Sequence, residues 1–153
     1  MKWYAIRVTY GRERKFCEAL GEKGFETFVP AFSNLCFVRT VKADLDDYMA
    51  GLGEACPARY MWDKAAHCPI IVPDKAMDDF IRISRIMADE ALYLSELGSR
   101  LREGQRVRVK SGPLAGIEGT VVRIKRSRRV VVELPGLLAI ATTFISPSDL
   151  EAI

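Results

Sequence analysis

Residues 103–124 read EGQRVRVKSGPLAGIEGTVVRI, and this stretch decides the fold of the C-terminal part of the chain. The alternation of polar and apolar residues over 106–110 is typical of a strand with one buried face. Gly112-Pro113 predicts a turn, and Gly116 and Gly119 flank the beginning of a second strand. Glycines at such places indicate positive φ or a close approach of two backbones, which other residues tolerate poorly.

The residues that follow continue the same pattern. Stretches 120–125, 129–134 and 137–141 are rich in β-branched and apolar residues, and short turns separate them. Four or five short strands in so few residues are typical of a small closed sheet. We therefore predict a five-stranded β-barrel over residues 101–153.

The N-terminal part mixes strands and helices. Its first residues alternate as a strand does, and the apolar residues that follow have the three- and four-residue spacing of an amphipathic helix. Short interleaved elements of this kind predict one antiparallel sheet flanked by helices, so the fold class is α+β. The expected strands are 2–10, 25–32, 34–41, 59–62 and 70–72, and the expected helices are 12–23, 43–52 and the segment that follows Asp74.

The balance of charged residues changes near residue 100, close to the beginning of the predicted barrel. Residues 1–99 carry 13 Lys and Arg against 15 Asp and Glu, whereas residues 100–153 carry 10 against 5. Such an asymmetry indicates two units with different partners. We expect a first domain at 1–90, a linker at 91–100 and a second domain at 101–153.

Composition excludes several classes of protein. The chain is 49% hydrophobic and 28% charged, as globular proteins are, and it lacks the run of about 20 apolar residues that crosses a membrane. The first ten residues do not form a signal peptide, so we expect a cytoplasmic protein. No nucleotide-binding loop, nucleophile motif or metal cluster is present in the sequence, which predicts no enzyme activity and no cofactor.

The four cysteines are scattered, at positions 17, 36, 56 and 68. They contain no C-x-x-C pair, so a zinc site is not expected, and a disulfide scaffold would be denser in cysteine. We predict four reduced structural cysteines. His67 adjoins Cys68, but adjacent residues rarely point toward each other as a nucleophile and its base must.

Residues 103–124 resemble the KOW motif, which certain ribosomal proteins share with transcription factors of the NusG type. In the N-terminal half, KWYAIRV, FVP, NLCFV and IIVPDKAMDDFI resemble the NusG N-terminal domain in order and spacing. VTYGRE, RYM, IVPDKAM and ATTFISPS are similar to the UpxY-type antiterminators of capsular polysaccharide operons. The resemblance implies a polymerase-binding N-terminal domain, a KOW barrel like a Src-homology-3 domain, and a role in transcription elongation and antitermination.

One feature departs from the family. Its members carry a basic loop between the second and third strands, whereas here Phe32 is followed directly by Ser33. Two good strands would then abut with almost no turn between them. We expect that residues of this loop are missing from the sequence.

The resemblance also implies how RNA polymerase is bound. An N-terminal face would lie on the clamp helices of the largest polymerase subunit, with apolar anchors and an arginine of the kind that protein interfaces use. The alternative is that Leu35 and Phe37 are covered by a helix of their own sheet. The residues at the matching positions are Trp3, Arg7, Leu35 and Phe37, with Thr40 and Lys42 at a second polymerase contact.

Two basic clusters are candidates for nucleic-acid binding, because cations bind phosphates well. Arg12, Arg14 and Lys15 match a region that faces the non-template DNA strand in the family, and leader RNA is a further candidate ligand. Arg126, Arg128 and Arg129 lie at an expected hairpin, where they would bind nucleic acid or a partner protein. The alternatives are an ordinary solvated face and a charged hairpin that prevents strand aggregation.

The expected partners of the barrel are a ribosomal protein or the termination factor Rho, as in NusG relatives. A second function is compatible with the motif, namely a KOW-type RNA-binding or ribosome-associated protein. The acidic N-terminal half argues against it, since a ribosomal protein is usually basic throughout.

Overall fold

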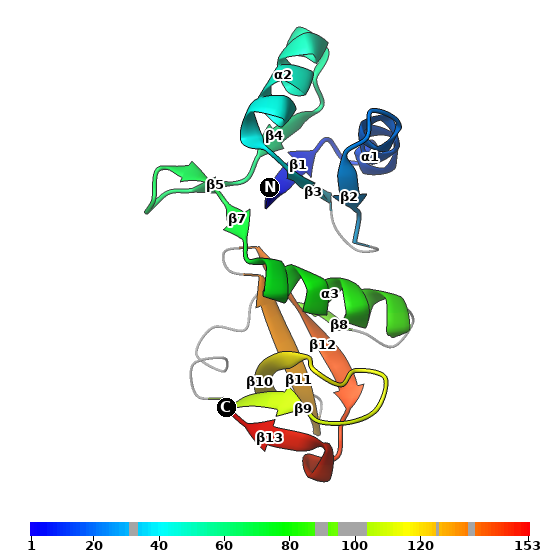
Figure 1. Ribbon diagram of the computed structural model, residues 1–153, viewed down its shortest axis with the longest axis vertical. Helices are drawn as coiled ribbons and strands as arrows, with labels where there is room; N and C mark the ends of the chain where they lie inside the picture. Colours follow the sequence, from blue (N-terminus) through cyan, green and yellow to red (C-terminus); the bar gives the residue numbers. More distant parts are fainter. Residues whose placement is uncertain (31–33, 88–91, 95–103, 125, 135–136) are drawn as a thin grey trace. The chain divides into compact units, whose positions relative to one another are not determined.

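A computed structural model describes residues 1–30, 34–87, 92–94, 104–124, 126–134 and 137–153 (Figure 1). The chain forms two compact units, Met1–Asp74 and Lys75–Ile153, called here the N-terminal and the C-terminal unit. The junction of Phe32 and Ser33, where a loop is expected to be missing, lies outside the described residues. So does most of the predicted linker.

The N-terminal unit is built on β1 (Lys2–Val8), which pairs with three other strands. All pairings are antiparallel, as predicted, and the sheet order is β2-β3-β1-β4, with β7 also on β1. The expected strands 59–62 and 70–72 do not pair with each other, because β4 and β7 both join β1 while β5 and β6 form a separate pair. The other elements are α1 (Glu13–Glu22), β2 (Glu26–Phe28), β3 (Leu35–Thr40), α2 (Lys42–Leu52), the short helix η1 (Gly53–Ala55), β4 (Ala58–Tyr60), β5 (Trp62–Asp63), β6 (Cys68–Pro69) and β7 (Ile71–Val72).

One face of this sheet carries the core. Alternate residues of β1 and β3 pack against the apolar side of α1, because strand side chains alternate between faces and helical ones recur every three or four residues. The aromatic ring of Tyr48 on α2 meets Phe16 and Phe25 edge to face. The buried residues of this cluster are Tyr4, Ile6, Val8, Phe16, Cys17, Leu20, Cys36, Val38 and Leu45.

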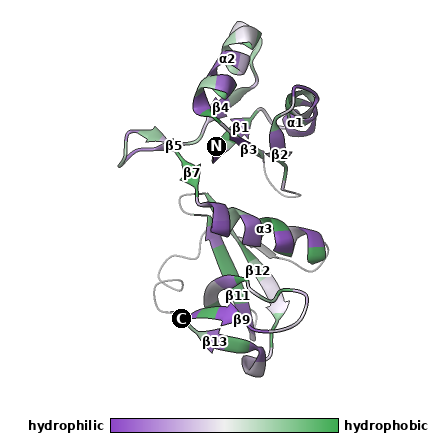
Figure 2. Ribbon diagram, in the orientation of Figure 1, coloured by the Kyte–Doolittle hydropathy of each residue, from purple (hydrophilic) through white to green (hydrophobic). Residues whose placement is uncertain are grey.

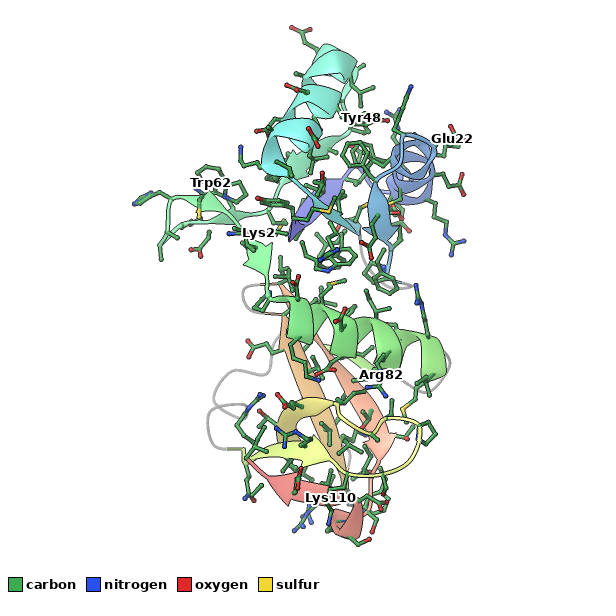
Figure 3. All side chains as sticks on the ribbon, in the orientation of Figure 1. Lys2, Glu22, Tyr48, Trp62, Arg82 and Lys110 are labelled. Carbon is green, nitrogen blue, oxygen red and sulfur yellow. A yellow bond between two sulfur atoms is a disulfide. The ribbon has the colours of Figure 1, made fainter. Side chains whose placement is uncertain are left out.

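The prediction of four reduced cysteines is wrong for two of them. Cys17 on α1 and Cys36 on β3 form a disulfide inside this core, visible as a bond between two sulfur atoms in Figure 3. Their Cα atoms are 6.6 Å apart although 19 positions separate them in sequence. The pair arises from the packing of helix on sheet, which cysteine spacing alone does not reveal. Cys56 and Cys68 are free thiols.

The C-terminal unit contains a sheet of order β13-β9-β10-β11-β12-β8. The five strands expected between residues 101 and 153 are present, and β8 from within the predicted linker adds a sixth by pairing with β12. The predicted closure of these strands into a barrel stays a prediction. The elements are α3 (Asp74–Ile86), β8 (Leu92–Leu94), β9 (Arg106–Val109), β10 (Glu118–Ile124), β11 (Ser127–Leu134), β12 (Leu138–Phe144), the short helix η2 (Pro147–Asp149) and β13 (Leu150–Ala152).

The glycines of the KOW-like stretch have the roles that the sequence predicts. Gly116 has φ of +90°, a conformation that side chains with a Cβ rarely adopt. At Gly119 an added Cβ would lie 2.5 Å from the carbonyl oxygen of Val131 on the neighbouring strand. Only glycine therefore allows β10 and β11 to pair at this point.

Helix α3 belongs to the C-terminal unit by its contacts, whereas the sequence grouped it with residues 1–90. Its residues alternate between hydrophilic and hydrophobic sides (Figure 2). Asp79 is 2% exposed and accepts hydrogen bonds from Lys75 Nζ at 2.7 Å and from the backbone N–H of Glu118 at 3.1 Å. Lys75 also donates to the carbonyl of Gly116, so two side chains fix the helix to the KOW-like loop. The expected domain limits stay a prediction.

Candidate protein- and nucleic-acid-binding surfaces

The residues expected to bind polymerase meet on one face of the N-terminal sheet. Ala5 lies opposite Phe37 and Arg7 lies opposite Leu35 in the antiparallel pairing of β1 and β3. Residues that face each other across two antiparallel strands project from the same side of the sheet. This side, called here the Trp3 face, is opposite the disulfide core and carries Trp3, Ala5, Arg7, Leu35, Phe37 and Arg39.

The apolar members of the Trp3 face are buried. Trp3, Leu35 and Phe37 are 3%, 6% and 0% exposed. Arg7 is exposed, and Arg39 forms an ion pair with Glu26 at 3.5 Å at the other end of the face. A partner can thus reach Arg7 directly.

Thr40 and Lys42 do not join this face. Thr40 lies opposite Lys2 and projects toward the disulfide core side, where its hydroxyl donates to the carbonyl of Val41. Lys42 donates to Asp46 at 2.7 Å and lies 5.3 Å from the ring centroid of Tyr60. Both side chains therefore have partners within the N-terminal unit.

Lys42, Asp46 and Tyr60 form a small polar network between α2 and β4. Tyr60 donates its hydroxyl hydrogen to Asp46 at 2.7 Å. The hydrogen bond from Lys42, followed by that from Tyr60, lowers the pKa of the Asp46 carboxyl. Burial, and then the hydrogen bond to Asp46, raises the pKa of Tyr60 above its ordinary range. This network holds Lys42 within the N-terminal unit, and its expected polymerase contact stays a prediction.

A shallow pocket of about 610 Å³ lies beside Arg7. Arg59 of β4, which the sequence analysis did not single out, lies directly opposite Arg7 and lines the same pocket. Like charges directly opposite each other are unfavourable unless an anion lies between them. Tyr10 at the rim is 89% exposed, so an aromatic ring and two guanidinium groups share this surface, called here the Arg7 pocket. Arg59 could have been found only by aligning β4 on β1, and the sequence does not give that register.

The predicted basic cluster at the beginning of α1 comes directly after residues 7–10, which line the Arg7 pocket. Arg12, Arg14 and Lys15 are exposed, and the Arg12 N–H donates to the carbonyl of Thr9 at 3.0 Å. Thr9 itself lines the Arg7 pocket. The two groups of cations are thus joined by one tight turn, which gives a positive surface suited to a phosphate backbone.

The second predicted cluster lies at the hairpin of β10 and β11. Arg123 lies directly opposite Arg128, and Arg126 in the turn has φ of +65°, an uncommon conformation for a residue other than glycine. Arg129 donates through Nη1 to the carbonyl of Thr142 at 3.1 Å. Its Nε is buried and has no hydrogen-bond partner in the described part of the chain.

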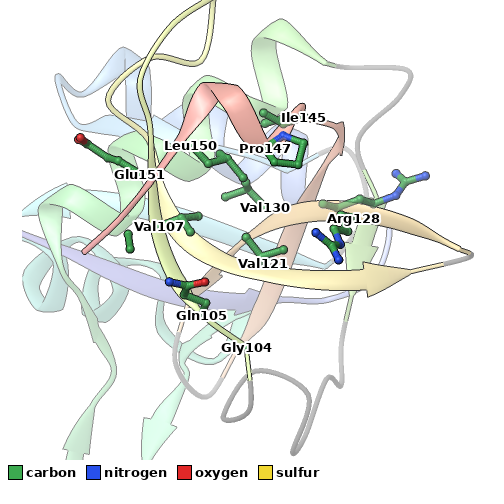
Figure 4. Close-up of a pocket in the computed structure, with 12 residues that line it drawn as sticks. Gly104, Gln105, Val107, Val121, Arg128, Val130, Ile145, Pro147, Leu150 and Glu151 are labelled. Carbon is green, nitrogen blue, oxygen red and sulfur yellow. The ribbon is translucent and has the colours of Figure 1, made fainter.

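Arg128 and Arg129 also line a pocket of about 440 Å³ in the C-terminal unit, called here the Arg129 pocket (Figure 4). Gln105 and Glu151 add polar groups to its lining. Glu151 is engaged by Arg108 at 3.1 Å, and the same guanidinium lowers the pKa of Glu118 by a hydrogen bond. The apolar side chains that line the pocket are Val107, Val121, Val130, Ile145, Pro147, Leu150 and Ala152.

Among the described residues, no three His, Cys, Asp or Glu side chains are grouped so as to hold a metal ion. Within the same residues, every helix is too short or too polar to span a membrane.

Comparisons with known proteins give one family match in each of the two units. Residues 1–51 match the family model described as transcription termination factor nusG, and residues 103–133 match that of the KOW motif. A solved structure concerned with domain interaction in Thermotoga maritima NusG matches with a TM-score of 0.52 and 20% identity, over 99% of this chain and 97% of that one. The search of curated proteins finds no match.

The fold is similar to that of a NusG protein, and the NusG family is one of transcription factors and not of enzymes. The two family matches, together with the shared fold, support placing the chain in the NusG family. They also support a role in the regulation of transcription elongation or antitermination, and an RNA polymerase as partner. The likeness to UpxY-type proteins stays a prediction.

Proposed function

We propose that this protein is a cytoplasmic transcription elongation factor that binds the clamp helices of the largest RNA polymerase subunit through the Trp3 face. The observation that supports this best is the pairing of β1 with β3, which gathers Trp3, Arg7, Leu35 and Phe37 on one side of the sheet. This side lies within the segment that matches the nusG family model.

The mechanism is a shift in a conformational equilibrium. A factor that binds the closed clamp more tightly than the open one favours the closed state by its difference in affinity. A closed clamp holds the template and so reduces pausing and termination. No covalent chemistry is required of the factor.

In this proposal the Arg7 pocket and the first turn of α1 contact the non-template DNA strand. Arg7, Arg59 and Arg12 supply cations, and the exposed ring of Tyr10 can stack on an unpaired base. A polysaccharide operon is the proposed target, on the resemblance of VTYGRE and ATTFISPS to UpxY-type proteins.

Binding of the full-length chain to immobilised bacterial core RNA polymerase tests the proposal. We expect specific binding that Arg7→Glu weakens by about tenfold, because an exposed charge at the interface is reversed. Lys23→Glu makes the same change at the end of α1, on the other side of the sheet, and should stay within about twofold. Absence of binding by the unaltered chain, or equal losses in the two variants, would refute the role of the Trp3 face.

A transcription assay on a paused template provides the functional readout. The chain should shorten pausing, and Arg7→Glu should abolish this effect at concentrations where Lys23→Glu retains it. If the chain instead binds ribosomal RNA tightly and does not bind polymerase, the ribosome-associated function is the better supported of the two.

A further inference from the structure

The Arg129 pocket of the C-terminal unit has three features that suit one kind of ligand. It is lined by two arginines, an aliphatic wall and the edge of a sheet (Figure 4). We propose that it binds a short extended acidic segment of a partner protein. This proposal concerns the C-terminal unit and does not rest on the proposed role of the Trp3 face.

The first feature is the pair of arginines that line the pocket, Arg128 and Arg129. Arg129 Nη1 is used by the carbonyl of Thr142, and its Nε is buried without a partner among the described residues, so a ligand reaches this Nε only if the side chain turns. A buried donor left unpaired is costly, and arginine binds carboxylates with two parallel N–H groups. Two arginines in one lining give a local potential that favours an anion.

The second feature is the edge of β13. The N–H of Lys110 donates to the carbonyl of Asp149, and the N–H of Ile153 donates to the carbonyl of Arg106. Since backbone groups of an antiparallel strand alternate in direction, those of Leu150 and Ala152 point away from β9. Where the chain is described, β13 pairs with β9 alone, so these groups can accept a further strand.

The third feature decides between a peptide and a nucleic acid. The lining is aliphatic, and none of its described residues is aromatic. Single-stranded nucleic acid is usually held by stacking on aromatic rings, and it has no backbone pattern that matches a strand edge. An extended peptide satisfies all three features at once, with a carboxylate on Arg129, an apolar side chain against Val121 and Val130, and its backbone along β13.

The experiment is a titration of the isotope-labelled full-length chain with a short capped peptide of alternating glutamate and valine. We expect a dissociation constant below about 1 mM, with the largest amide shifts at Leu150, Ala152 and Arg129. A peptide with glutamine in place of glutamate, and a short single-stranded oligouridylate, are the two comparison ligands. Both should bind at least about tenfold more weakly.

Three variants locate the site, each first checked by circular dichroism. Arg129→Gln, and also Arg129→Lys, should weaken peptide binding by about tenfold, because lysine cannot form two parallel hydrogen bonds. Ala152→Pro removes one outward N–H without breaking the pairing with β9 and should weaken binding similarly. Arg123→Gln is the matched control, since it removes a charge from the same hairpin outside the pocket.

Several outcomes would overturn the proposal. They are tighter binding of the oligouridylate, an equal loss with Arg123→Gln, unchanged affinity with Ala152→Pro, and no binding of the acidic peptide at millimolar concentration. Arg128→Gln and Ala152→Pro keep the test decisive if Arg129 proves necessary for folding.

Discussion

The two units each attach a helix to a sheet, but they do so by different means. In the N-terminal unit the apolar side of α1 packs on the sheet, and the disulfide between Cys17 and Cys36 links the helix to β3. In the C-terminal unit α3 is fixed by hydrogen bonds of Lys75 and Arg82 to the carbonyls of Gly116 and Pro113, and of Asp79 to the N–H of Glu118. An apolar interface tolerates small shifts, whereas hydrogen bonds require fixed partners. The attachment of α3 should therefore be more sensitive to single substitutions than that of α1 once the disulfide is set aside.

Loss of the disulfide should change the stability of the N-terminal unit more than any other change considered below. A cross-link that closes a loop of this length stabilises the folded state by about 3 kcal/mol, chiefly by restricting the unfolded chain. We expect Cys36→Ala to destabilise the N-terminal unit by about this amount, as measured by hydrogen exchange at amides of β3. Cys56→Ala removes a free thiol and should cost about 1 kcal/mol or less. Four alkylatable thiols in the denatured, unreduced chain would show that the disulfide does not form.

Substitution of Gly119 tests the close approach of β10 and β11. The new Cβ of Gly119→Ala would meet the carbonyl oxygen of Val131, so a strand must shift, at a cost of about 2–3 kcal/mol. Gly21→Ala is a matched change in α1, where an added Cβ meets nothing within 4 Å. It should stabilise the N-terminal unit by up to about 1 kcal/mol. Equal effects of the two substitutions in thermal unfolding would contradict this account.

The positions of Gly116 and Gly119 were the most predictable part of the fold, because the need for a glycine depends on the local backbone conformation and on the neighbouring strand. Alternation and turn residues likewise give β1, α1 and the strands of the C-terminal sheet. Sequence reasoning missed the Cys17–Cys36 pair, the position of Arg59 opposite Arg7, and the contacts of α3 with the C-terminal unit. Each depends on register or packing between distant segments, which residue patterns do not specify. The resemblance placed four residues expected to bind polymerase on one strand pair, but it did not indicate that Trp3, Leu35 and Phe37 are buried while Arg7 is exposed.

Removal of the buried carboxylate tests how α3 is attached. In Asp79→Ala the backbone N–H of Glu118 loses its acceptor and Lys75 loses its ion pair, at a cost of about 2 kcal/mol. The neighbouring Asp78 is exposed, so Asp78→Ala should change the stability by no more than about 0.5 kcal/mol. The measurement is hydrogen exchange at amides of β10. Similar values for the two variants would mean that the apolar side of α3 alone holds the helix.

Titration of the network of Lys42, Asp46 and Tyr60 should give the smallest change in stability, and this change should be confined to the N-terminal unit. The pKa of Asp46 is lowered in the folded state, so its contribution is present above about pH 4 and is lost as the pH falls through the folded value. The pKa of Tyr60 is raised, so its contribution is present below about pH 10 and is lost as the pH rises toward the folded value. Because the Asp46 side chain is 42% exposed, solvent screening keeps the acidic contribution below about 1 kcal/mol. Tyr60→Phe should remove the alkaline loss and Asp46→Asn the acidic one, in unfolding followed by amides of the N-terminal unit. The stability of the C-terminal unit should not respond to either substitution, since the network lies entirely within the N-terminal unit.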